Sequence, residues 1–180
     1  MAFKLVMASK NYSSWSLRAW LALAQTGAPF EQLLISTAER DWHEQIKRVS
    51  PSGKVPLLIE DGLQIGDSLA IVEYLNERFP KAGLWPRDSA ARAIARSVCA
   101  EMHSGFVELR KAMWMDVVKR WPGRGRTKGA LADIRRVCDL WSDTRRRFGA
   151  DGPFLFGKEF NLADAFYAPV ATRFVTWSPD

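Results

Sequence analysis

At 180 residues, with 47% hydrophobic and 12% aromatic side chains, the chain is long enough for one or two domains and too apolar to be disordered. Its apolar runs fall short of the ~20 residues that span a membrane, and residues 1–10 show no signal-peptide pattern, so the sequence predicts a cytoplasmic protein. The net charge is −1 over residues 1–80 and +7 over residues 81–180, but acidic residues interrupt the basic half, which indicates solvated helices rather than a nucleic-acid partner. No membrane partner is expected either.

The first 80 residues alternate strand and helix signals. Leu17, Trp20 and Leu21 recur at helical spacing and Gly27 ends that helix, while Glu60-Asp61-Gly62 between two apolar runs predicts a tight hairpin. The predicted order is βαβα followed by ββα. The strands are expected at 3–7, 30–35, 55–59 and 63–65, and the helices at 13–26, 39–49 and 67–79.

Strand signals stop after the first 80 residues. Residues 81–88 contain Gly83 and Pro86 and are predicted to form a linker. Residues 89–180 are predicted to be all helical, with one long helix at 90–121, a second at 128–148 and a third from Asn161 towards Arg173. Asn161 followed three residues later by Asp164 has the spacing of a capping box, which gives both residues a structural role.

The cysteines and histidines are few and far apart. Cys99 and Cys138 are separated by 39 positions and fit no C-x-x-C or metal-ligand spacing, so two free thiols that are buried and unreactive are expected. His43 and His103 are too isolated for a zinc site, and no metal is expected.

Serines gather where the first predicted strand passes into the first helix. Ser13, Ser14 and Ser16 lie beside the unpaired N–H groups of the helix start, where negative charge is favoured by about 0.3–1 kcal/mol. One of them can be an ordinary N-cap, but one cap does not need three hydroxyls.

Two further short motifs stand next to predicted strands. Lys54-Val55-Pro56 precedes the third strand, where a cis bond would turn the backbone of Val55 outward to pair with an extended peptide, and a trans proline that simply starts the strand is the ordinary alternative. Asp67-Ser68 opens the next helix, where Ser68 can act as its cap, the helix amides can hold a carboxylate and Asp67 can hold an ammonium group.

In this order, and followed by a helical half that starts its last helix with Asn161-Leu162-Ala163-Asp164, these motifs resemble the cytosolic glutathione S-transferase family over nearly the whole chain. The serine-rich segment that leads into the first helix is most similar to that of the zeta-like and related bacterial serine-type members. The resemblance implies a thioredoxin-like N-terminal domain (1–80) that binds glutathione and an all-α C-terminal domain (89–180). Because family members continue for several tens of residues beyond Arg173, the C-terminal end is expected to be short or truncated.

The resemblance also assigns roles. It implies that Val55, before cis-Pro56, pairs with the cysteinyl backbone of glutathione, that Asp67 and Ser68 hold its γ-glutamyl end, and that Lys54 reaches its other carboxylate. The serine at the start of the first helix then donates a hydrogen bond to the thiolate. By position this is Ser13, with Ser14 and Ser16 as alternatives.

A hydroxyl is sufficient for this chemistry because the nucleophile belongs to the ligand. Lowering a thiol pKa from about 8.5 by about two units takes ~2.7 kcal/mol. A charge-assisted hydrogen bond of about 1.5–3 kcal/mol beside a helix N-terminus is of that size. Because serine rather than cysteine stands at this position, thiol–disulfide exchange is not expected.

The expected activity is addition of the glutathione thiolate to small hydrophobic electrophiles. A glutathione-dependent isomerase of an unsaturated acid, and a non-catalytic binding protein of the same fold, remain alternatives. The resemblance implies a homodimer, with an electrophile pocket between the domains. Candidate pocket residues on the long helix after the linker are Met102, His103, Phe106, Arg110, Met113 and Trp114.

Overall fold

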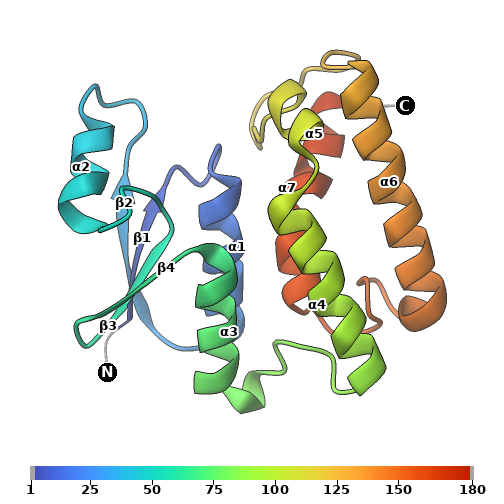
Figure 1. Cartoon of the computed structure of the whole chain (residues 1–180), viewed down its shortest axis with the longest axis horizontal. Helices are drawn as coiled ribbons and strands as arrows, with labels where there is room; N and C mark the ends of the chain where they lie inside the picture. Colours follow the sequence, from blue (N-terminus) through green and yellow to red (C-terminus); the bar gives the residue numbers. More distant parts are fainter. Residues whose placement is uncertain (1–2, 179–180) are drawn as a thin grey trace. The chain divides into compact units, whose positions relative to one another are not determined.

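The computed structural model describes residues 3–178, which form two compact units, Met1–Ala82 and Gly83–Asp180 (Figure 1). The first unit is α/β and the second is helical, which confirms the predicted fold class. A short 3-10 helix, Pro80–Ala82, ends the first unit.

The first unit is built on a four-stranded mixed sheet in the order β2-β1-β3-β4. β1 runs parallel to β2 and antiparallel to β3, and β3 forms the predicted hairpin with β4. The connection from β1 to the parallel β2 passes through a helix, as a parallel pair requires. The strands are β1 (Phe3–Ala8), β2 (Phe30–Ile35), β3 (Leu57–Glu60) and β4 (Leu63–Gly66).

Helices cover both faces of this sheet (Figure 1). Side chains alternate along β1, so Val6 points to one face and its neighbours Leu5 and Met7 to the other, and all three are fully buried. On the Val6 side, Ile46 of α2 packs into the same apolar cluster. The helices of this unit are α1 (Ser14–Gln25), α2 (Trp42–Val49) and α3 (Ser68–Arg78), of which α1 and α3 contact each other.

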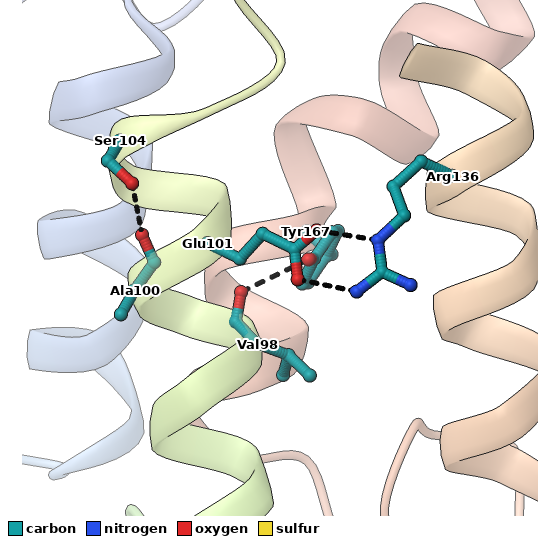
Figure 2. Close-up of polar contacts among 6 residues, drawn as sticks. All are labelled: Val98, Ala100, Glu101, Ser104, Arg136 and Tyr167. Carbon is teal, nitrogen blue, oxygen red and sulfur yellow. Dashed lines mark hydrogen bonds and ion pairs between the residues drawn. The ribbon is translucent and has the colours of Figure 1, made fainter. Parts of the chain in front are cut away.

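The helical unit is organised around α7 (Leu162–Trp177), most of whose side chains are buried. The Tyr167 hydroxyl on α7 donates to the carbonyl of Val98 on α4 (3.1 Å), and Arg136 on α6 holds Glu101 on α4 by two hydrogen bonds of 2.7 and 2.8 Å (Figure 2). The remaining helices are α4 (Ser89–Ser104), α5 (Val107–Ala112) and α6 (Lys128–Thr144), which continues as a π-helical turn, Arg145–Gly149.

The start of α7 has the capping box that the sequence predicts. The Asn161 side chain accepts from the N–H of Ala163 (2.9 Å), and the Asp164 carboxylate accepts from the N–H of Asn161 (3.0 Å) and of Leu155 (2.9 Å). Burial raises the pKa of the Asp164 carboxyl, and its backbone hydrogen bonds oppose that rise. Asp164 therefore ties the preceding loop to the helix start.

The predicted long helix at 90–121 is wrong. α4 ends at Ser104 because Gly105 is extended and Phe106 is left-handed (φ 57°), and the Arg110 side chain donates to carbonyls of the last turn of α4. A Cβ at Gly105 would lie 2.8 Å from the carbonyl oxygen of Glu101. After α5, residues 113–127 have no regular secondary structure.

Candidate functional site

The three motifs of the first unit meet at one edge of its sheet. In the strand register Val6 lies opposite Leu57, and Leu57 lies opposite Gly66. The end of β1, the start of β3 and the end of β4 therefore share this edge. The serine segment follows β1, Lys54-Val55-Pro56 precedes β3, and Asp67-Ser68 follows β4, so the topology brings all three predicted motifs together.

At the start of α1 the three serines have different environments. Ser13 is the N-cap, and its Oγ accepts from the N–H of Ser16 (3.3 Å) and donates to the Ser16 Oγ (2.9 Å). Ser16 is fully buried and also accepts from the N–H of Ala8 at the end of β1 (3.1 Å). Ser14 is 6% exposed, and its hydroxyl makes no hydrogen bond within residues 3–178. Ser16 thus fastens α1 to β1, which leaves Ser13 and Ser14 closest to a ligand role.

The segment ahead of β3 has the cis Val55–Pro56 bond that the resemblance implies. Among the described residues, no hydrogen bond uses the backbone N–H or C=O of Val55. Lys54 is exposed, while Pro56 is buried. Sequence reasoning missed Ser50, a buried residue whose Oγ donates to the carbonyl of Lys54 (2.7 Å) and so shapes this segment. The only sequence feature that pointed to Ser50 is the surrounding run of residues that interrupt helices and strands.

At the start of α3 the cap is Asp67 and not Ser68. The Asp67 Oδ1 accepts from the N–H of Leu69 (2.7 Å), and Asp67 has a φ of 69°. Such a backbone costs a non-glycine residue about 1–3 kcal/mol and is concentrated at functional sites. Ser68 is 1% exposed, and within the described part of the chain its buried Oγ has no hydrogen-bond partner. An unsatisfied buried hydroxyl costs about 1–3 kcal/mol, so this atom is suited to a partner from outside the chain.

The electrostatics of this edge favour an anion. α1 and α3 both begin here, and each helix N-terminus carries a partial positive charge with unpaired N–H groups. Arg18, which sequence reasoning did not select, is fully buried on α1 with its guanidinium 4.6 Å from the centre of the Trp15 ring. The sequence feature that could have identified Arg18 is its position, a cation on the apolar side of a predicted helix.

The residues predicted to line an electrophile pocket have unequal positions in the helical unit. Met102 and Met113 are fully buried, and Phe106 is 6% exposed. Trp114 is 48% exposed, and the backbone carbonyl of His103 accepts from Arg110. Burial lowers the pKa of the Arg110 guanidinium, which is held by main-chain carbonyls at the end of α4. The contacts of these side chains are thus mainly structural.

Two hollows of the helical unit are lined by other residues. One of about 420 Å³ lies between residues 83–91 and 148–161, and one of about 390 Å³ lies along Trp141, Phe154 and Tyr167. Among residues 3–178, no group of three or more His, Cys, Asp or Glu side chains is placed to hold a metal ion. Cys99 is buried as expected, but the expectation is wrong for Cys138, which is exposed on α6. No helix in this described part is long and apolar enough to cross a membrane.

Known proteins similar to this chain share both units. Residues 12–78 match the family model "Glutathione S-transferase, N-terminal domain", and residues 90–180 match "Glutathione S-transferase, C-terminal domain". A maleylacetoacetate isomerase of Rattus norvegicus is 31% identical over 176 residues, covering 93% of this chain and 77% of the relative. Glutathione S-transferase Z1 of Arabidopsis thaliana is 28% identical over 176 residues, covering 92% and 75%.

Solved structures show the same fold. A glutathione transferase homologue from Burkholderia GL BGR1 with bound glutathione superposes with a TM-score of 0.73 at 22% identity, covering all of this chain and 85% of that one. Glutathione transferase Omega 2S of Trametes versicolor gives 0.70 at 24% identity, covering 97% and 71%. With both halves matched by family models and a relative above 30% identity along most of its length, the chain belongs to the glutathione S-transferase family.

Proposed function

We propose that this protein is a glutathione transferase whose first unit binds glutathione and adds its thiolate to small hydrophobic electrophiles. The observation that carries the proposal is the buried Ser68 Oγ, which has no partner among residues 3–178 and lies at the sheet edge where two helices begin. Glutathione is an acidic tripeptide, and a carboxylate that accepts from Ser68 would satisfy this hydroxyl. The family uses glutathione, and the residues present fit it.

The ligand would extend along this edge in one direction. Asp67 and Ser68, with the start of α3, would hold the γ-glutamyl end through its ammonium and carboxylate groups. The backbone N–H and C=O of Val55 would pair with the cysteinyl residue as an added strand does. Lys54, which is exposed, would reach the glycyl carboxylate. In this arrangement the thiol would lie towards the start of α1.

At that point Ser13 would donate to the thiolate. Its Oγ accepts from the N–H of Ser16, and its proton, directed to the Ser16 Oγ in the free protein, can turn to a stronger acceptor. Exchanging a neutral for a charge-assisted hydrogen bond gains about 1 kcal/mol or more, and the helix start adds about 0.3–1 kcal/mol. Ser14, whose hydroxyl is uncommitted, is the alternative donor.

Isomerisation is a second candidate because the Rattus norvegicus relative at 31% identity is named maleylacetoacetate isomerase. The same thiolate would add to the double bond of an unsaturated acid. Rotation about the resulting single bond and expulsion of the thiolate would then return glutathione unchanged. Both reactions use the same glutathione site, so they differ only in the second substrate. We further expect the family's homodimer and a cytoplasmic location.

The test combines binding and turnover. Calorimetry with glutathione should show binding that Ser68→Ala and Asp67→Ala weaken. Turnover with a model aryl halide and with maleylacetoacetate separates conjugation from isomerisation, and Ser13→Ala should remove most of either activity. Ser104→Ala is a matched control, because this exposed hydroxyl on α4 donates to the carbonyl of Ala100 (Figure 2). Glutathione binding without turnover would favour the non-catalytic alternative. If Ser68→Ala and Asp67→Ala both bound glutathione as the parent chain does, the proposed binding site would be wrong.

A further inference from the structure

The irregular segment after α5 is held firmly to the end of α7. We name this segment, together with Lys128 at the start of α6, the basic loop (residues 113–128). Side chains of α7 donate to its carbonyls, Arg173 to Met113 (2.8 Å), Thr176 to Asp116 (2.6 Å) and Trp177 to Trp114 (2.9 Å). The backbone N–H groups of Trp121 and Gly123 donate to the carbonyls of Thr176 (2.7 Å) and Trp177 (3.0 Å). The outward side chains of the basic loop therefore present a surface of fixed shape.

This surface is strongly cationic. Five Lys or Arg residues and no Asp or Glu lie between positions 117 and 132. Within residues 3–178, Lys119, Arg120, Arg124 and Lys128 form no ion pair, and the nearest acid in the sequence, Asp116, is only 2% exposed and accepts from the backbone of the loop. The five cations, all exposed, are Lys119, Arg120, Arg124, Arg126 and Lys128.

Exposed apolar side chains adjoin these cations. Val118 is 73% exposed, more than any other large hydrophobic side chain described, and Val117 and Trp114 are 42% and 48% exposed. The two aromatic rings are already occupied, because Lys119 and Arg124 lie over the ring of Trp121 (5.7 and 5.3 Å) and Trp114 packs edge-on against Trp177 (4.5 Å). Base stacking, which single-stranded nucleic acids require of such a surface, would have to displace these contacts.

We propose that the basic loop binds the surface of an anionic lipid bilayer. Lys and Arg side chains would pair with lipid phosphates and carboxylates, while Val117 and Val118 enter the interface beneath the headgroups. Aliphatic side chains beside exposed cations suit this environment, since neither group alone binds a membrane strongly. The binding is peripheral and independent of the glutathione site, so it goes beyond the proposed function.

Vesicle flotation tests the proposal with the 180-residue chain and phosphatidylcholine vesicles that contain or lack phosphatidylserine. The chain should float with the anionic vesicles only, and salt should weaken the association. Lys119→Gln with Arg120→Gln should reduce the partition constant roughly 25-fold, at about fivefold per cation. Val117→Ser with Val118→Ser should reduce it at unchanged charge.

The matched control is Arg146→Gln with Arg147→Gln, which removes the same formal charge from cations that are paired with Asp143. It should bind vesicles like the parent chain. Equal losses in the control, flotation with uncharged vesicles alone, or no flotation at all would overturn the proposal. So would an unaffected double Val variant together with oligodeoxythymidylate that displaces the chain from vesicles, because the loop would then bind nucleic acid. Thermal unfolding and glutathione binding establish that each variant is folded.

Discussion

Replacing Ser68 by alanine should separate stability from binding. In the free protein the Ser68 Oγ is buried without a partner among the described residues, so its burial costs about 1–3 kcal/mol that no hydrogen bond returns. Alanine removes that oxygen and little else. We therefore expect Ser68→Ala to unfold at the same temperature as the parent chain or a few degrees higher, at roughly 2–4 °C for each kcal/mol in a chain of this size.

The same substitution should weaken glutathione binding. A hydrogen bond to a carboxylate is worth about 1.5–3 kcal/mol, so its loss should raise the Kd roughly 10- to 140-fold. Differential scanning calorimetry measures the first effect and titration calorimetry the second. Ser16→Ala is the control, because this equally buried hydroxyl accepts from the Ala8 N–H and its loss should destabilise the fold by about 1–3 kcal/mol. If Ser68→Ala destabilised the free chain as much and left the Kd unchanged, the hydroxyl would be structural and the reasoning wrong.

Four further results are expected. Ser13→Ala should lower stability by about 1 kcal/mol through loss of the α1 cap and raise the thiol pKa of bound glutathione, whereas Ser14→Ala should do neither. Denaturant unfolding measures the first effect and thiolate absorbance the second, and a raised thiol pKa in Ser14→Ala but not in Ser13→Ala would make Ser14 the donor. Gly105→Ala should cost about 1–3 kcal/mol in the same unfolding assay, because the new methyl group meets the Glu101 carbonyl at 2.8 Å, and an unchanged midpoint would contradict this. Asp164→Ala should cost roughly 2–5 kcal/mol, since two backbone N–H groups lose their acceptor, and a loss below 1 kcal/mol by urea titration would count against that role. Arg136→Gln should cost only about 0–1 kcal/mol despite two short hydrogen bonds, because the ion pair with Glu101 is largely exposed, and this difference should shrink in high salt.

The first unit is predicted well from sequence because its signals are local. Gly27 and the Glu60-Asp61-Gly62 turn mark the ends of elements, and the alternation of strand and helix in 1–80 determines which sheet edge each motif reaches. The roles of Ser13, Ser14 and Ser16 cannot be told apart from local sequence. Three equivalent residues in one short segment have the same propensities, and only the approach of the Ala8 N–H from β1 assigns Ser16 to the interior.

The helical unit is predicted less well because apolar periodicity continues across a real break. Met102, Phe106, Leu109 and Met113 keep helical spacing and are all buried, yet α4 ends before Phe106. The Ser104-Gly105 pair is a weak stop signal, and the contacts that stabilise the break come from distant residues. Asp133 on α6, for example, accepts from the N–H of Leu109 (2.9 Å). No local sequence pattern indicates a contact between residues so far apart in the chain.

The attachment of the basic loop to α7 has a consequence for biosynthesis. The hydrogen bonds from Arg173, Thr176 and Trp177 join residues separated by 60 to 63 positions, an unusually long range for a helical domain. A nascent chain can form α4 and α6 early, but this loop lacks its α7 partners until the end of α7 has left the ribosome. During that interval the carbonyls of Met113, Trp114 and Asp116 lack the α7 side chains that donate to them, so this part of the fold forms only after α7.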